Sequence, residues 1–409
     1  MPGGSVRSEI KSVSVLALGF GLVGIDRYLI STMYPVIAKD LHLGYGDIGT
    51  ITGALAIAWA VAALWMGNLS DRLGRRRVLV GALLVFSLLI GASGLAKGLM
   101  GLVLVRLVMG FADGAFTPAS ISATIEASAL ERRGRNIGIQ QMTLTLFGLG
   151  FAPLAVAALL HFINWRVVFS VFALPGLIVA WLTWRIIPAR WHAAEWRERS
   201  SFADWKAVLS YSNIRVLTVL MLCWLTCLVT TSAFIPSLLL DHHHLNFSSM
   251  STVMSSIGLG AAAGTLCLPW LSDRVGRKPV VMLSTVGACL MLVLLNSAGA
   301  NVPLLFCTLF MVHFFNNALI TLTVGPLCAE SVPAELMATA SGVVIAVGEL
   351  FGGGFAVMIA GQVATRLGIS KILLLPTATL VLGLILSTRL RETRPRELRG
   401  IQAGVTPAS

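Results

Sequence analysis

The distribution of apolar residues along this 409-residue chain limits its fold more than any other feature. Twelve apolar runs are each long enough to cross the ~30 Å hydrocarbon core of a bilayer as an α-helix, which takes about 20 residues. They lie at about 13–38, 46–66, 78–96, 99–123, 137–161, 165–187, 214–240, 249–270, 279–299, 302–327, 337–361 and 370–390. Charged residues are only 12% of the chain, too few to cover a water-exposed surface, since soluble proteins carry roughly 25%. The sequence predicts an all-α polytopic membrane protein with twelve transmembrane helices.

An internal repeat relates the first six runs to the last six. The segment Leu-Ser-Asp-Arg-x-Gly-Arg follows the second run at 69–75, and it recurs 202 residues later at 271–277. A repeat of half the chain predicts two pseudo-symmetric six-helix halves that face one another. The expected units are an N-terminal segment (1–12), a first half (13–187), a linker (188–213), a second half (214–390) and a C-terminal tail (391–409).

The basic residues predict the orientation of the chain in the membrane. Lys and Arg number 30 against 18 Asp and Glu, and 23 of the basic residues fall in the termini and in the loops on one face. The other face has five: Lys39, Lys97, Arg166, Arg366 and Lys371. Because basic loops stay in the cytoplasm, we expect a multi-pass protein of the cell (inner) membrane with both termini and the linker cytoplasmic. This topology also explains the net charge of +12, so no nucleic-acid partner is expected.

The two repeated loops form short charged turns on the predicted cytoplasmic side. Gly74 and Gly276 permit a tight turn between consecutive helices. Asp71 and Asp273 can accept hydrogen bonds from a helix N-terminus or from nearby arginines. We expect the loops to act as a conformational latch between the halves; the alternative is that they only fix topology. The predicted latch residues are Gly67, Asp71, Arg72, Gly74, Arg75, Asp273, Arg274, Gly276 and Arg277.

These motifs resemble those of the major facilitator superfamily, and the resemblance covers nearly the whole chain. Besides the duplicated loop, the fourth run has Arg106-x-x-x-Gly110 and ends with Pro118 and Glu126, and Trp165-Arg166-x-x-Phe169 follows the fifth. The second copy of the loop departs from the family pattern at Pro269, where glycine is usual. The resemblance implies a secondary transporter that works by alternating access, with Glu126 as part of the latch.

Five charged residues lie inside predicted transmembrane helices, where charge is costly and marks function. They are Asp26, Arg27, Arg106, Asp113 and Glu349. Arg106, Gly110 and Asp113 are spaced to share one helix face, and Gly110 allows a close backbone approach beside the charges. An arginine suits bidentate capture of a carboxylate. The alternative is a buried ion-pair network that only locks helices together.

The first run narrows the resemblance to the anion:cation symporter family. Its pattern Asp26-Arg27-x-x-Ile30-Ser31-x-x-x-Pro35-x-Ile37-x-Lys39-Asp40-Leu41 looks like the first-helix signature of that family. This implies that Arg27 binds a substrate carboxylate, while Asp26 and Asp113 take up protons. Because a coupling acid must change protonation beside an arginine, we expect Asp113 first, Asp26 second and Glu349 as the next candidate. The chain departs from the family at Asp113, where Glu is common, and at Gly24-Ile25. The aromatic-acid:proton symporters are the family with the second-best resemblance to this chain.

Other polar residues inside the predicted helices are weaker candidates. Gln140, Gln141, Asn316 and Asn317 could bind substrate hydroxyl groups or hydrogen-bond between helices. His313 is a proton-relay candidate or a satisfied core histidine, and Glu349 either lines the pathway or braces the glycine-rich helix beside it. No metal site is expected, because the histidines at 242–244 fit a solvated loop better.

The leading hypothesis is a proton-coupled symporter that imports a small organic anion, such as a sugar acid, a hydroxy acid or an aromatic acid. The alternatives are a proton-driven exporter of drugs or metabolites and, less well supported, a membrane sensor on a transporter fold. An enzyme is not expected, because no nucleophile–base constellation stands out. The expected partners are the substrate, protons and the lipid bilayer, and we expect a monomer with no cofactor. The sequence has no glycine-rich phosphate loop, which argues against transport driven by ATP.

Overall fold

The computed structural model describes residues 6–188, 202–333 and 336–393, apart from the side chains of 64–73, 202–204 and 338. Every regular element in these ranges is helical, and together the elements form twelve spans long and apolar enough to cross a membrane. The predicted fold class is confirmed.

The first four spans are single helices: α1 (Val6–Leu41), α2 (Tyr45–Leu73), α3 (Arg75–Ser93) and α4 (Leu99–Ala127). After the short η1 (Leu130–Arg132), the fifth span is made of α5 (Arg133–Thr145), η2 (Leu146–Phe151) and α6 (Ala152–Leu160). The sixth span, α7 (Trp165–Ile186), completes the first half.

The second half begins with the short α8 (Phe202–Ser210), which precedes α9 (Ser212–Ser237) with η3 (Leu238–His242), α10 (Phe247–Val275) and α11 (Arg277–Ser297). The tenth span is α12 (Val302–Leu322) with η4 (Thr323–Leu327), and the eleventh is made of α13 (Met337–Val347), η6 (Gly348–Phe355) and α14 (Ala356–Leu367). The half ends with η7 (Ile369–Lys371) and α15 (Leu374–Ser387).

The first helix begins earlier than the apolar pattern alone indicates. α1 starts at Val6, inside the segment expected to precede the first span. Its polar first turns are held by Glu9, whose carboxylate accepts hydrogen bonds from Arg132 at 2.6 and 3.1 Å and from Asn136 at 2.9 Å. The side chains of η1 and α5 thus stabilise the polar start of this helix.

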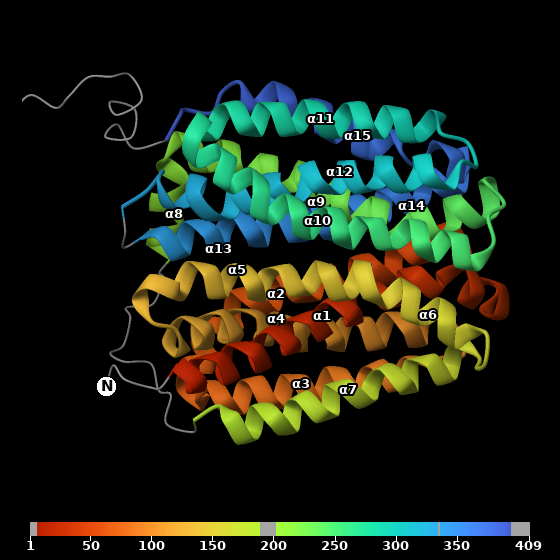
Figure 1. The fold of residues 1–409 in the computed structure, drawn as a ribbon, viewed down its shortest axis with the longest axis horizontal. Helices are drawn as coiled ribbons and strands as arrows, with labels where there is room; N and C mark the ends of the chain where they lie inside the picture. The colour runs from red at the N-terminus through yellow and green to blue at the C-terminus, as the bar shows by residue number, and fades with distance from the viewer. Residues whose placement is uncertain (1–5, 189–201, 334–335, 394–409) are drawn as a thin grey trace, which may run out of the picture.

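The two halves lie side by side as separate layers of roughly parallel helices (Figure 1). α1 begins and α15 ends at the same side of the bundle, called here the terminal side; the other is the opposite side. The predicted tight turns are present on the terminal side, where Gly74 (φ 86°) joins α2 to α3 and Gly276 (φ 116°) joins α10 to α11. Positive φ values of this kind favour glycine over any residue with a Cβ atom.

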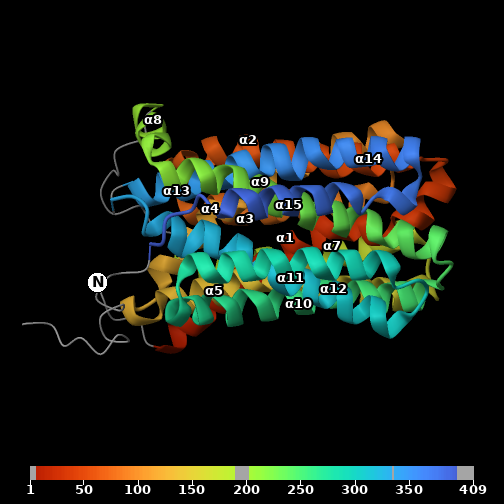
Figure 2. The same cartoon turned by 90° about the horizontal axis from the view of Figure 1, so that it is seen from above.

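Glycines allow the halves to approach closely where they meet. Figure 2 shows α2 beside α14, and a Cβ atom on Gly49 would lie only 2.6 Å from the carbonyl oxygen of Val357. A Cβ atom on Gly258 of α10 would lie 2.1 Å from the backbone nitrogen of Gly150 in η2. Small residues of this kind let membrane helices pack backbone to backbone.

The opposite side is also tied by a hydrogen bond between the halves. The Tyr45 hydroxyl at the start of α2 donates to Oδ2 of Asp241 in η3 at 3.0 Å. On the terminal side, the Arg75–Glu126, Arg132–Glu9, Arg277–Asp273 and Arg277–Glu330 pairs each lie within a single half. The Tyr45–Asp241 hydrogen bond thus links α2 of the first half to η3 of the second half.

Candidate functional site

A buried ion pair joins the two halves in the middle of the bundle. Nη2 of Arg27, in α1, lies 2.5 Å from Oε2 of Glu349, in η6. Arg27 is only 8% exposed and Glu349 only 6%. A Cβ atom on Gly353 would lie 2.6 Å from the same Glu349 oxygen and 3.6 Å from Arg27 Nη2. The glycine therefore leaves the room that the ion pair occupies.

The local helix geometry positions Glu349 for this contact. Residues 348–355 form a π-helical segment in the eleventh span, between the α-helical segments α13 and α14. π-Helical bulges are rare and often occur at functional sites. Aromatic rings flank the other partner, because the Arg27 guanidinium lies 5.9 Å from the ring centres of both Tyr28 and Trp59. Arg27 thus lies in a buried, partly aromatic setting that strengthens charge interactions.

A second group of charges lies beside this pair within the first half. Arg106 of α4 donates from Nη1 to the main-chain oxygen of Asp26 at 2.6 Å, and the same nitrogen is 3.5 Å from Asp26 Oδ1. The structure thus pairs Arg106 with Asp26. Asp113 adjoins the Asp26 carboxyl and the charges of Arg27 and Arg106. Its two carboxyl oxygens have no N–H or hydroxyl donor among the described residues.

The predicted role of Gly110 in backbone approach is confirmed. A Cβ atom at this position would lie 2.4 Å from the carbonyl oxygen of Leu55 in α2, and one on Gly114 would lie 2.7 Å from that of Trp59. The two glycines bring α4 against α2. This packing holds Arg106 and Asp113 next to α1 and explains why both are only 1% exposed.

The weaker polar candidates differ in their surroundings. Gln140 donates to Ser120 Oγ at 2.6 Å, and Asn316 donates to the Trp224 carbonyl at 3.1 Å; both side chains are fully buried. These are the helix-to-helix hydrogen bonds that the packing interpretation expects. Gln141 is exposed, whereas the buried Asn317 amide nitrogen has no partner among the described residues. His313 Nε2 lies 3.1 Å from Thr231 Oγ1.

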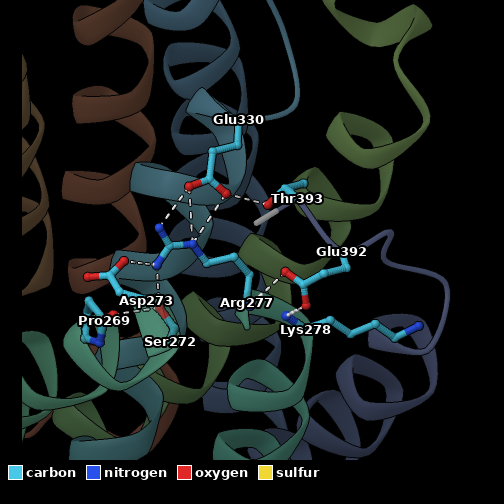
Figure 3. Close-up of polar contacts among 8 residues, drawn as sticks. All are labelled: Pro269, Ser272, Asp273, Arg277, Lys278, Glu330, Glu392 and Thr393. Atoms are coloured by element: carbon cyan, nitrogen blue, oxygen red, sulfur yellow. Dashed lines mark hydrogen bonds and ion pairs between the residues drawn. The ribbon is translucent and has the colours of Figure 1, made fainter. Parts of the chain in front are cut away.

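On the terminal side, the second repeated loop forms a network of charges around Arg277 (Figure 3). Nη1 of Arg277 lies 2.5 Å from Asp273 Oδ1, and Nη2 lies 2.8 Å from Glu330 Oε1 at the end of the tenth span. Glu392 accepts hydrogen bonds from the backbone nitrogens of Arg277 and Lys278 at 2.9 and 3.1 Å. Arg274 lies over the ring of Trp270, 3.7 Å from its centre. The network therefore ties several helices of the second half to one another.

The first half contains an equivalent pair, between Arg75 and Glu126. The side chains of the other predicted latch residues in this loop, Gly67, Asp71 and Arg72, lie outside the described part of the structure. Sequence reasoning missed Glu330, although the repeat contained the signal. Glu330 ends the tenth span as Glu126 ends the fourth, and each pairs with the arginine that closes its repeated loop.

We expect Asp273→Asn to slow transport without weakening equilibrium binding of substrate. Asp273 is 59% exposed in its side chain, and surface pairs of this kind add little to stability, about 0–1 kcal/mol. A latch changes the balance of conformations instead. Initial uptake rates and equilibrium binding should be measured on the same preparation, with Asp273→Glu as the matched control. An unchanged uptake rate in Asp273→Asn would show that this carboxylate has no role in the latch.

Comparison with known proteins identifies the family. The family model described as Major Facilitator Superfamily matches residues 16–356 and 230–407. The chain belongs to this superfamily. It is thus a multi-pass membrane transporter, as the sequence predicts.

Two curated superfamily relatives are similar over most of their length. A probable 4-methylmuconolactone transporter of Cupriavidus pinatubonensis is 26% identical over 389 residues, which are 92% of this chain and 89% of the relative. A 3-(3-hydroxy-phenyl)propionate transporter of Escherichia coli is 28% identical, over 85% of this chain and 87% of the relative. The crystal structure of a bacterial homologue of the human lysosomal transporter Spinster, inward-facing and occupied, matches with a TM-score of 0.78 at 17% identity, over 99% of this chain and 100% of that one. This last likeness concerns the fold.

Proposed function

We propose that the protein is a proton-coupled symporter that takes up a small organic anion by alternating access. The observation that carries this proposal is the buried Arg27–Glu349 pair, which crosses between the halves at 2.5 Å. The relatives that carry 4-methylmuconolactone and 3-(3-hydroxyphenyl)propionate support an organic-acid substrate. We further propose that it acts as a monomer in the inner membrane with its termini in the cytoplasm.

In this proposal, the Glu349 carboxylate pairs with the Arg27 guanidinium when no substrate is bound. A substrate carboxylate competes for the Arg27 guanidinium, which suits planar, bidentate recognition of carboxylates. The displaced Glu349 carboxylate would then be buried and unpaired, at a cost of several kcal/mol. Binding a proton removes this cost, so substrate and proton bind together. Because the pair crosses the halves, its opening and closing is coupled to their relative movement.

The charge balance of the whole cluster supports the same coupling. Three buried carboxyl groups (Asp26, Asp113 and Glu349) face two buried guanidinium groups (Arg27 and Arg106). One bound proton neutralises the empty cluster, and we place it between Asp26 and Asp113, whose adjacent carboxyls would otherwise repel each other. A bound monoanion requires one further proton. The proposed stoichiometry is therefore one proton per monoanion, and transport is electroneutral.

The remaining predicted residues receive supporting roles. We propose that Arg106 holds Asp26 and so fixes the position of α1, since it donates to that residue's main chain. The exposed Gln141 and the Asn317 amide, whose nitrogen has no partner among the described residues, are candidates for binding substrate hydroxyl groups. Gln140 and Asn316 would act through the helix contacts that they already make.

Uptake by the purified protein in proteoliposomes tests the proposal. The labelled panel should contain sugar acids, aromatic acids and short hydroxy acids, each assayed with and without a pH gradient that is alkaline inside. We expect one class to accumulate only with the gradient. If no acid of the panel accumulates, or if uptake does not depend on the pH gradient, proton-coupled import of organic anions is rejected.

The proposed topology gives a separate prediction. A cysteine at Ser248, in the first turn of α10 on the opposite side, should react with an impermeant thiol reagent in intact cells. A cysteine at Ala207, in α8 on the terminal side, should react only after the cells are opened. Both positions are exposed, so the comparison depends on membrane side alone. The reverse pattern would overturn the proposed orientation.

A further inference from the structure

A pocket of about 590 Å³ lies on the opposite side of the bundle, between the two halves. Lys39 and Asp40 at the end of α1 line it together with Trp165 and Arg166 at the start of α7. Leu240 of η3 and Phe247 of α10 close it from the second half. The proposed topology places this pocket outside the membrane. Relative movement of the halves would separate its two walls and connect it to the path between them.

Asp40 organises the polar side of the pocket. Its Oδ2 accepts hydrogen bonds from Arg166 Nη1 at 2.6 Å and from Trp165 Nε1 at 3.2 Å. The Arg166 guanidinium also lies over the Trp165 ring, 4.2 Å from its centre. Since an arginine has five N–H donors and Arg166 uses only Nη1 in the described ranges, it keeps donors for a ligand. Arg166, held by Asp40 and stacked on the Trp165 ring, can therefore donate hydrogen bonds to a ligand in the pocket.

Lys39 gives the pocket a net positive charge. Asp40 balances Arg166, whereas Lys39 has no ion-pair or hydrogen-bond partner in the part of the chain that the structure describes. The N-terminus of the 22-residue helix α7 adds the positive end of a helix dipole. The loops on this face hold only five basic residues, and two of them line the pocket. The preference for basic residues in cytoplasmic loops does not explain them here.

We infer that this pocket is an outer binding site for the carboxylate of an organic anion before it reaches Arg27, an inference that rests on the proposed function. Lys39 and Arg166 bind the carboxylate, and Asp40 holds Arg166 in place. Lys39 follows Arg27 by twelve residues on α1, which is about 18 Å along a helix that rises 1.5 Å per residue. One helix thus carries both sites, and the outer site raises the local anion concentration at the entrance.

Thiol labelling tests the site without any need for transport. Val36 lines the pocket and is partly buried, so Val36→Cys is introduced with the six native cysteines replaced by alanine. The protein is held in zwitterionic lipid, which supplies no anionic headgroup. We expect an anionic methanethiosulfonate to react faster than a cationic one, and Lys39→Gln to lower this rate ratio about tenfold or more. Lys39→Arg should preserve the ratio, as should Lys97→Gln, because Lys97 does not line the pocket.

Added 3-(3-hydroxyphenyl)propionate is the ligand probe. It should slow labelling of Val36→Cys, and the protection should be lost in Lys39→Gln. A rate ratio that does not depend on Lys39, or labelling that the probe does not slow, would overturn the inference. If protection persists while no acid of the panel is taken up, the site stands and the proposed function fails. For an acid that is taken up, Lys39→Gln in the native background should raise KM several-fold and leave kcat unchanged; an unchanged KM contradicts the site.

Discussion

Arg27→Lys is expected to lower substrate affinity and uptake by at least about a hundredfold. Lysine keeps the positive charge but loses the planar fork that holds a carboxylate through two parallel hydrogen bonds. Arg27→Gln should be more severe, because it leaves Glu349 buried without its partner. Breaking a buried ion pair from one side destabilises a protein by about 3–5 kcal/mol. Binding of labelled substrate and the thermal unfolding midpoint report these effects separately.

The double variant Arg27→Gln with Glu349→Gln separates binding from stability. It removes both charges, so the unfolding temperature should recover most of what Arg27→Gln loses. Substrate binding should stay lost, because the guanidinium is absent. Wild-type binding in Arg27→Lys, or in the double variant, would show that Arg27 does not hold the substrate.

Glu349→Gln is expected to abolish accumulation driven by a pH gradient while exchange of substrate across the membrane persists. The neutral amide no longer competes as a charge for Arg27, so the substrate still binds. The variant cannot bind and release the proton that accompanies the substrate. The empty carrier also lacks the Arg27–Glu349 pair, and its return across the membrane should slow. Counterflow exchange and gradient-driven uptake, measured on the same proteoliposomes, distinguish the two activities.

Asp113→Asn and Asp26→Asn provide the comparison for this variant. If the shared proton lies between Asp26 and Asp113, either change alters the pH dependence of uptake. Full gradient-driven accumulation in Glu349→Gln, combined with its loss in Asp113→Asn, would move the coupling site from Glu349 to α4. That result would make Asp113 the primary proton site, which is the role that we expect for it from the sequence.

The sequence was informative wherever structure depends on local patterns. The lengths of the apolar runs predict the twelve spans, and the repeated loop predicts the two halves and the turns at Gly74 and Gly276. The spacing of Arg106 and Gly110 correctly predicts a helix face with charge beside a close backbone contact. Each of these features is set within a few residues by helix periodicity or by glycine conformation.

The contacts between the halves could not be predicted in this way. Arg27 and Glu349 are 322 positions apart, and nothing near either residue indicates which helix faces meet across the molecule. The π-helical segment that contains Glu349 also interrupts the 3.6-residue periodicity that assigns residues to a helix face. Gln140 and Asn316 show the same limit, because a buried amide can bond another helix or a substrate. Helix packing decides between these outcomes.

The most direct test of electroneutral proton coupling compares two driving forces in proteoliposomes loaded with the transported acid. A pH gradient and a potassium diffusion potential should be imposed separately. The account predicts about tenfold accumulation of a monoanion for each pH unit, since one unit corresponds to about 1.4 kcal/mol, and no accumulation from the potential alone. Accumulation that depends on the membrane potential and not on the pH gradient would contradict electroneutral proton coupling.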